Sequence, residues 1–232
     1  MSLYVYAVLA RSPRAAMGIG IGRARVRIMR CGGLFVAVGA VRTAPVMSAR
    51  AVRMHDAVVR RLAAGVEAVL PARFGTVFAD GTALARSLAE RETALRVALR
   101  LVEGREQMTL RVYGATAAAP PAPDGSGDPH DDGGAETRGA RGSGTRYLAG
   151  RARRHQVAAL AQLRPFLGGV VVAERVERHA APPLVASAYH LIPRGASKDY
   201  RSRLTRASPA LAPLRVRVSG PWPAYAFAPG PA

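Results

Sequence analysis

The first 113 residues alternate uniformly apolar runs with amphipathic ones, a pattern typical of strands interleaved with helices. Residues 3–9 are apolar at every position, which predicts a central strand covered on both faces. Residues 25–30 alternate arginine with apolar side chains, and residues 34–41 form a further apolar run after Gly32 and Gly33. Consecutive glycines tolerate the positive φ angles of a tight turn, so these two runs are expected to pair as a hairpin.

Two longer segments have helical periodicity. Ser48 can cap a helix that runs to about residue 63, with His55 on its apolar face. Asp80 can cap a second, continuous helix whose apolar stripe ends at Val102, and residues 105–113 then alternate again as a strand. The order of strands and helices predicts a sheet with helices on one face, related to the ferredoxin-like sandwich.

Residues 114–144 have a different composition, with eight glycines, four prolines and five acidic residues. They hold almost no large apolar side chain, so burial cannot offset the entropy lost on ordering, and we expect a disordered linker. The linker divides an N-terminal α+β domain, residues 1–113, from a smaller C-terminal α+β domain, residues 145–219. A tail rich in proline and aromatic residues, 220–232, follows, and its prolines argue against regular helix or sheet.

The C-terminal domain begins with an amphipathic pattern and continues with alternating ones. We expect a helix at residues 145–164, a pair of strands at 168–178 and 183–192, a short basic helix at 197–207 and a last strand near Val216. The chain is therefore predicted to be an α+β protein of two domains.

The formal net charge of +19 is the most unusual feature of the composition. Lys198 is the one lysine among 34 basic residues, which indicates that part of the arginine excess reflects a GC-rich coding sequence. Residues 1–61 carry 11 basic side chains and 1 acidic one, and residues 145–232 carry 14 and 3. Such regions attract polyanions and acidic protein surfaces, so a basic nucleic-acid-binding module is the alternative function that the composition favours.

Several side chains invite a catalytic or metal-binding interpretation, and their spacing argues against each. Gly18, Gly20 and Gly22 form GxGxG rather than the GxGxxG of a dinucleotide-binding turn. The five histidines have neither HxH nor HExxH spacing, and the single Cys31 excludes a multi-cysteine zinc site. An enzyme on a ferredoxin-like scaffold would have no acid–base or nucleophile constellation here, so we predict no catalytic residue, metal or cofactor.

The opening of the chain and its longest apolar runs predict neither secretion nor membrane insertion. The first apolar run stops at Arg11 with no basic segment before it, unlike a signal peptide. No stretch of about 18 apolar residues is present, so no membrane span is predicted. We expect a cytoplasmic protein.

Two stretches are specific enough to suggest a family: VLPARFGTVF at residues 69–78 and GPWPAYAF at residues 220–227. Together with the opening LYVYAV, they resemble the F/L family of gas vesicle proteins (GvpF/GvpL), over nearly the whole chain apart from the linker. The chain departs from the family pattern at Ala224 and Ala226, where Pro and Ser are usual.

The resemblance implies a non-enzymatic accessory protein of gas vesicle assembly, located in the cytoplasm and at the gas vesicle. Its implied partners are the hydrophobic major shell protein and other gas vesicle accessory proteins, with no dedicated nucleic acid site and no membrane. A free shell subunit would expose a large apolar surface to water, which explains why its assembly needs a partner.

The same two stretches supply the candidate partner-binding residues, each with a structural alternative. Pro71 and Gly75 can simply shape a turn while Phe74 fills the core, and the tail can pack back onto the second domain. Trp222 is the only tryptophan, and a segment stiffened by proline loses little entropy on docking. The candidates are Pro71, Arg73, Phe74, Gly75, Gly220, Pro221, Trp222, Pro223, Tyr225 and Phe227.

Overall fold

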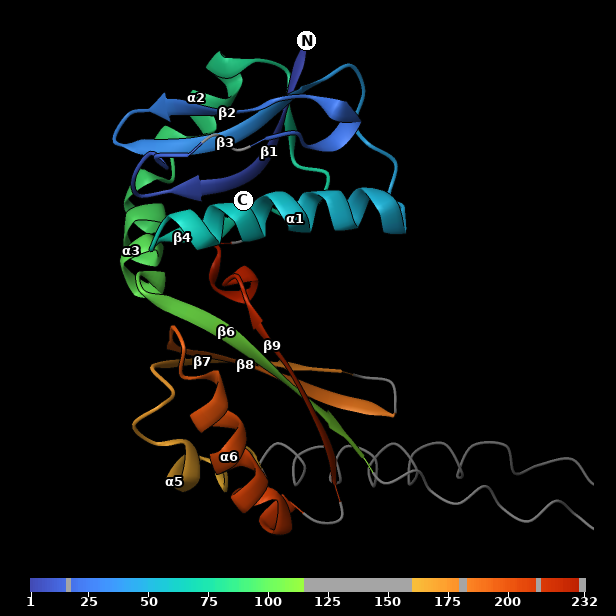
Figure 1. The fold of residues 1–232 in the computed structure, drawn as a ribbon, viewed down its shortest axis with the longest axis vertical. Coiled ribbons are helices and arrows are strands. Elements are labelled where there is room, and N and C mark those ends of the chain that lie inside the picture. The colour runs from blue at the N-terminus through green and yellow to red at the C-terminus, as the bar shows by residue number, and fades with distance from the viewer. Residues whose placement is uncertain (16–17, 115–159, 180–182, 212–213, 230–232) are drawn as a thin grey trace, which may run out of the picture.

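The protein forms two antiparallel sheets with helices packed against them, so the predicted α+β class is confirmed (Figure 1). The expected linker after residue 114, and most of the helix expected at 145–164, lie outside the described residues. The computed structural model describes residues 1–15, 18–114, 160–179, 183–211 and 214–229.

The N-terminal sheet is built around the first apolar run. β1 (Ser2–Leu9) lies between β3 (Leu34–Val41) and β4 (Val69–Pro71), and β2 (Val26–Cys31) extends the sheet beyond β3. The short strand β5 (Val77–Phe78) also pairs with β1. The central place of β1 and the β2–β3 hairpin are both confirmed.

Helices cover both faces of this sheet. α1 (Ala49–Gly65) lies on one face, and α2 (Gly81–Ala89) and α3 (Glu92–Val102) lie on the other. The alternation of β1 explains this arrangement, because Tyr4 belongs to the core beneath α1 and Val5 belongs to the core beneath α2 and α3. The expectation of helices on one face is wrong, since a strand that is apolar at every position requires cover on both sides.

Ser48 and Asp80 cap α1 and α2 as predicted. Each side-chain oxygen accepts a hydrogen bond from the backbone N–H three residues later, at 3.2 and 2.8 Å. The continuous helix expected after Asp80 is wrong, because Arg91 adopts φ −120° and ψ 8° and its N–H bonds the Leu88 carbonyl in a tight turn. Leu88 and Leu95 on the two sides of the break still reach one core, so the apolar stripe survives the interruption.

The C-terminal sheet has the strand order β7 (Ala173–Arg178), β8 (Leu184–Pro193), β6 (Arg105–Tyr113) and β9 (Arg215–Trp222). β6 was expected to complete the domain at residues 1–113, but it pairs with β8 and β9 instead. Alternation indicates which face of a strand is buried and does not identify the strand that supplies its hydrogen bonds. The assignment of this strand to the first sheet is therefore wrong.

Short helices cover one face of the C-terminal sheet. α5 (Arg164–Leu167), α6 (Ser197–Ala207) and the 3₁₀ turn η2 (Ser208–Leu211) supply buried side chains to its core, where Tyr200 is fully enclosed. The helix expected at 197–207 is confirmed, and the two strands expected before it pair, although β7 begins at Ala173 rather than at residue 168.

The tail continues the sheet further than its prolines suggested. β9 runs through Gly220 and Pro221 to Trp222, and a 3₁₀ turn, η3 (Tyr225–Phe227), follows. β9 is the outer strand and its register with β6 shifts between Ser219 and Trp222, so proline occupies an edge position beside an irregularity, where a missing N–H is tolerated.

The tail also joins the two sheets. Ala224 and Phe227 are 3% and 1% exposed and belong to the core beneath α2 and α3, together with Leu191 of β8. Figure 1 shows the C-terminal segment returning from β9 toward α1 and the first sheet. The tail thus packs within its own chain, against both halves: it fills the first core, and Arg175 of β7 donates to the Ala226 carbonyl at 2.7 Å and lies over the Phe227 ring.

Candidate functional site

α1 carries two stripes of side chains with different roles. The predicted stripe faces inward, and His55 on it is 3% exposed. A second stripe, spaced four residues apart along the helix, contains Val52, Asp56 and Arg60 and faces outward. Val52 is 40% exposed, and the Arg60 Nε donates to Asp56 Oδ2 at 2.6 Å.

A chain of hydrogen bonds through Tyr4 and His55 fixes the turn at residues 71–75. His55 Nε2 lies 3.1 Å from the Ala72 carbonyl, which only accepts, so Nε2 carries the proton and Nδ1 accepts from the Tyr4 hydroxyl at 2.8 Å. The same hydroxyl accepts from the Gly75 N–H at 3.3 Å. Phe74 contacts both rings edge-on, at centroid distances of 6.1 and 6.0 Å.

Burial controls the protonation of this cluster. It raises the pKa of Tyr4 to about 12, and it lowers the pKa of His55 despite the nearby Ala72 carbonyl and Asp56 carboxylate, which act in the opposite direction. Tyr4 therefore stays a neutral donor and His55 a neutral imidazole. The turn is held by uncharged hydrogen bonds inside an apolar core.

The tail meets α1 through its two largest side chains. The Tyr225 hydroxyl donates to Asp56 Oδ1 at 3.2 Å, and the Arg60 guanidinium lies 4.7 Å from the centre of the Trp222 ring. Burial, and then the Asp56 charge, raise the pKa of Tyr225, so this hydroxyl keeps its proton. Asp56 and Arg60 together link Tyr225 and Trp222 of the tail to the helix.

These elements enclose a groove of about 440 Å³. One wall is α1, the second is the turn at residues 71–75, and the third is the tail. Its apolar surface comes from Val52, Phe74 and Trp222, and arginines flank it. The groove is lined by Val52, Arg53, His55, Asp56, Arg73, Phe74, Trp222 and Tyr225.

Four of the ten sequence candidates line the groove: Arg73, Phe74, Trp222 and Tyr225. The other six lie around it or away from it. Pro71 is buried at the end of β4, and Gly75 adopts φ +87° in the turn. Phe227 is directed into the core rather than the groove. Gly220, Pro221 and Pro223 lie in β9 or directly after it.

The contribution of α1 to this site was not predicted from the sequence. The helix has a second face, on which Val52, Asp56 and Arg60 recur at every fourth position. Only the apolar stripe beside it, which packs into the core, was assigned from the sequence. No pattern in the chain could indicate that residues 71–75 and 222–225 meet, because their contact depends on the path of β6 and β9.

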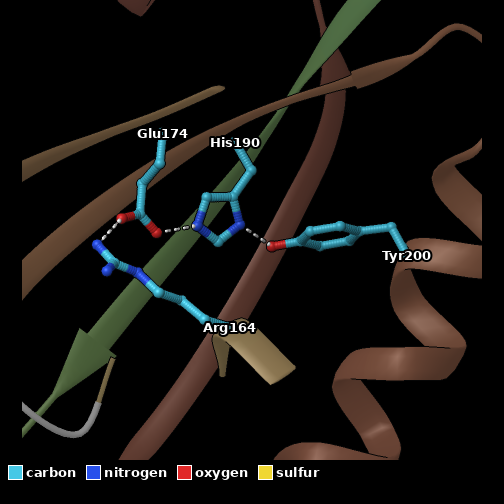
Figure 2. A network of polar contacts seen from close by, with 4 residues as sticks. All are labelled: Arg164, Glu174, His190 and Tyr200. Carbon is cyan, nitrogen blue, oxygen red and sulfur yellow. Dashed lines mark hydrogen bonds and ion pairs between the residues drawn. The ribbon is translucent and has the colours of Figure 1, made fainter. Parts of the chain in front are cut away.

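A second polar cluster lies in the C-terminal sheet (Figure 2). His190 of β8 is held between Glu174 of β7, whose Oε2 is 3.0 Å from Nε2, and Tyr200 of α6, whose hydroxyl is 2.6 Å from Nδ1. Arg164 reaches the same carboxylate at 3.5 Å. The hydrogen bond with His190 is the main cause that lowers the pKa of Glu174.

A cavity of about 280 Å³ borders this cluster, and its lining includes Arg164, Glu174 and His190 but not Tyr200. His190 is 2% exposed and Tyr200 is fully buried. The network therefore fastens β7, β8 and α6 together rather than presenting a reactive group. Among the described residues, no group of three or more histidine, cysteine, aspartate or glutamate side chains is placed to hold a metal ion.

Within the part of the chain that the structure describes, no helix combines the length and apolar character needed to cross a bilayer.

Comparison with known proteins identifies the family. The fold is similar to the crystal structures of the gas vesicle protein GvpF from Anabaena sp. PCC7120 and from Microcystis aeruginosa, each with a TM-score of 0.74 and 16% sequence identity. Both alignments cover 98% of this chain, and they cover 96% and 99% of those chains. Among curated protein sequences, none matches significantly.

The sequence profile of the family described as gas vesicle synthesis protein GvpL/GvpF matches residues 2–229. The match includes both stretches that suggested the resemblance, residues 69–78 and 220–227. Since the profile spans nearly the whole chain, the protein belongs to the GvpL/GvpF family of gas vesicle proteins.

Proposed function

We propose that the protein is a gas vesicle assembly factor that acts by protein–protein contact and has no catalytic role. The observation that carries this proposal is the convergence of two stretches, distant in sequence, on one groove. Turn formation alone would account for Pro71 and Gly75, but it gives no reason for Phe74 and Trp222 to line the same cavity. An aromatic groove of this kind is a common anchor site for a partner segment.

The chemistry of the groove suggests its occupant. Phe74 and Trp222 offer apolar surface, while Arg53 and Arg73 are exposed at its margin. We propose that an apolar segment of the major shell protein lies on the aromatic surface. The remaining basic surface then attracts acidic regions of other accessory proteins and raises the rate of encounter.

The test is capture of the shell protein by tagged variants. The full chain is co-expressed with the major shell protein, treated with nuclease and washed at about 0.5 M salt, where exposed charge pairs are largely screened. Val52→Glu places a charge in the groove at a position that is 40% exposed, and Trp222→Ala removes its largest ring. Both should abolish most of the captured shell protein.

Val97→Glu is the matched control, because Val97 on α3 is 53% exposed and does not line the groove. It should capture as much shell protein as the wild type. Equal capture by all four proteins would reject the groove as the contact site. Loss of the shell protein from the wild type, with nucleic acid recovered at low salt without nuclease, would instead favour the nucleic-acid-binding module.

A further inference from the structure

β7 is one of the two edge strands of the C-terminal sheet, at the end opposite β9. Among the described strands, none pairs with β7 on the side away from β8. Residues 174–178 are all exposed, and Val176 in the middle is 41% exposed. An open edge presents backbone N–H and C=O groups that can hydrogen-bond to a further strand.

The ladder with β8 determines which backbone groups are available. The His179 N–H bonds the Val185 carbonyl at 3.0 Å, in the same register as the β7–β8 pairing. Hydrogen-bonded positions alternate in an antiparallel ladder, so the odd-numbered residues of β7 face β8. The N–H and C=O groups of Glu174, Val176 and Arg178 therefore point toward the open edge.

The side chains of β7 are complementary to themselves about Val176. When two copies of the strand run antiparallel with Val176 opposite Val176, Arg175 lies opposite Glu177 and Glu174 lies opposite Arg178, each twice. Within one chain, Glu174 also contacts His190 and Arg164, Arg175 donates to the Ala226 carbonyl, and Glu177 accepts from the Tyr189 hydroxyl, so the attraction between copies adds to these contacts. Opposite charges at directly opposed positions stabilise an antiparallel pair. This register also places the outward-pointing backbone groups of residues 174, 176 and 178 against one another. A two-fold axis at Arg175 or Glu177 would instead oppose like charges.

The charge pattern distinguishes β7 from the other long edge strands in the described part of the chain. β2 and β9 carry arginine as their only charged residue type, which repels a second copy. β7 holds two of the three acidic residues between positions 145 and 232 of a chain with a net charge of +19. Phe166 and Val172, 39% and 46% exposed, add apolar surface close to it in sequence.

We propose that β7 pairs antiparallel with β7 of a second copy of this chain, about a two-fold axis at Val176. The pairing joins two four-stranded sheets into one continuous sheet and leaves the groove between α1 and the tail outside the contact. The dimer does not require the partner proposed for the groove, although Arg175 of β7 donates to the Ala226 carbonyl of the tail. Six residues a side make a small interface, so the dimer forms at high local protein concentration.

Cysteine cross-linking tests the register. Val176→Cys brings two cysteines opposite each other at a Cα–Cα distance of about 5.5 Å, within the range of a disulfide. Arg178→Cys is the control on the same edge, because its two copies would lie four residues apart along the strand, about 14 Å, beyond disulfide reach. On mild oxidation at about 0.1 mM, where a small interface is populated, Val176→Cys should give a covalent dimer. Arg178→Cys and the wild type, whose Cys31 is buried, should stay monomeric on a non-reducing gel.

Sedimentation velocity tests the pairing without cross-linking. Val176→Lys places two ammonium groups face to face on the axis and should weaken dimerisation at least about tenfold. Val97→Lys adds the same charge at a similarly exposed position on α3 and should leave it unchanged. A wild-type protein that sediments as a monomer at about 0.1 mM would overturn the proposal. Equal cross-linking of the two cysteine variants, or equal weakening by the two lysine variants, would overturn it as well.

Discussion

At the level of single residues, His55 should make the stability of the protein depend on pH. The effect of its burial on its pKa outweighs the opposing effect of the nearby Asp56 carboxylate. Burial lowers its pKa below the ordinary value of 6.5. Between 6.5 and the lower folded value, the unfolded chain binds a proton that the folded chain does not. The free energy of unfolding should therefore fall as the pH decreases through this window, by at most about 1.4 kcal/mol per pH unit from this residue.

His55→Gln removes this contribution and provides the comparison. Urea unfolding of both proteins between pH 7.5 and 5 should show a shallower pH dependence for the variant. At pH 7.5 the variant should be less stable by about 1–3 kcal/mol, because the Tyr4 hydroxyl and the Ala72 carbonyl lose a partner. Parallel curves would show that His55 titrates alike in both states and would contradict the argument.

The role of a single residue could be predicted where the local helix pattern alone determines it. Ser48, Asp80 and the burial of His55 follow from local pattern and are present in the structure. The roles of Asp56 and Arg60 were not predictable, since each takes its second contact from the tail, which follows them by more than 150 positions in the printed sequence.

At the level of elements, a strand's buried face was easier to predict than its partner. β6 has the expected length and buries Met108, Leu110 and Val112 as expected, but Gln107 and Thr109 on its other face are buried as well, and hydrogen bonding to β8 and β9 places the strand in the other sheet. Apolar periodicity likewise concealed the turn at Arg91, because Leu88 and Leu95 keep the stripe in phase across the break. Both errors arise because apolar periodicity reports which side chains are shielded from solvent. It identifies neither the partner of a strand nor a helix break that leaves the apolar stripe in phase.

Gly220 allows β9 to bend from the sheet toward the first core, and this can be tested by substitution. It adopts φ +119°, and an added Cβ would lie 2.8 Å from the Gln107 carbonyl oxygen and 3.1 Å from Met108 Sδ. Gly220→Ala should therefore reduce the free energy of unfolding by about 1–3 kcal/mol, measured by urea titration.

Gly65→Ala, at the end of α1, provides the control for the Gly220 substitution. Nothing lies within 4 Å of the Cβ it would add, and its φ is not positive, so the protein should be unchanged or up to about 1 kcal/mol more stable. Equal effects of the two alanines would show that the conformation of Gly220 does not constrain β9.

At the scale of the whole molecule, the two sheets share contacts that sequence patterns could not predict. Leu191 from β8 and Phe227 from the tail belong to the same core as α2 and α3. Backbone bonds reinforce the junction, with the Gly104 N–H donating to the Glu67 carbonyl at 3.1 Å and the Arg194 N–H donating to the Gly104 carbonyl at 2.9 Å. We expect the described parts of both sheets to unfold as one cooperative unit.

Phe227→Ala tests this coupling, because the ring is 1% exposed and links the C-terminal end of the chain to the first core. Removing a buried phenylalanine costs about 3–5 kcal/mol, whereas Phe166→Ala, at a position 39% exposed, should cost less than about 1 kcal/mol.

Trp222, the only tryptophan, lies at the junction and reports locally by fluorescence, while far-ultraviolet circular dichroism reports on both sheets. The wild type should show coincident transitions by both probes. In Phe227→Ala the fluorescence transition should move to a lower denaturant concentration, because the tail loses its anchor. The circular dichroism transition should stay in place or move less. Equal shifts for the two phenylalanine variants would mean that the tail does not hold the two sheets together.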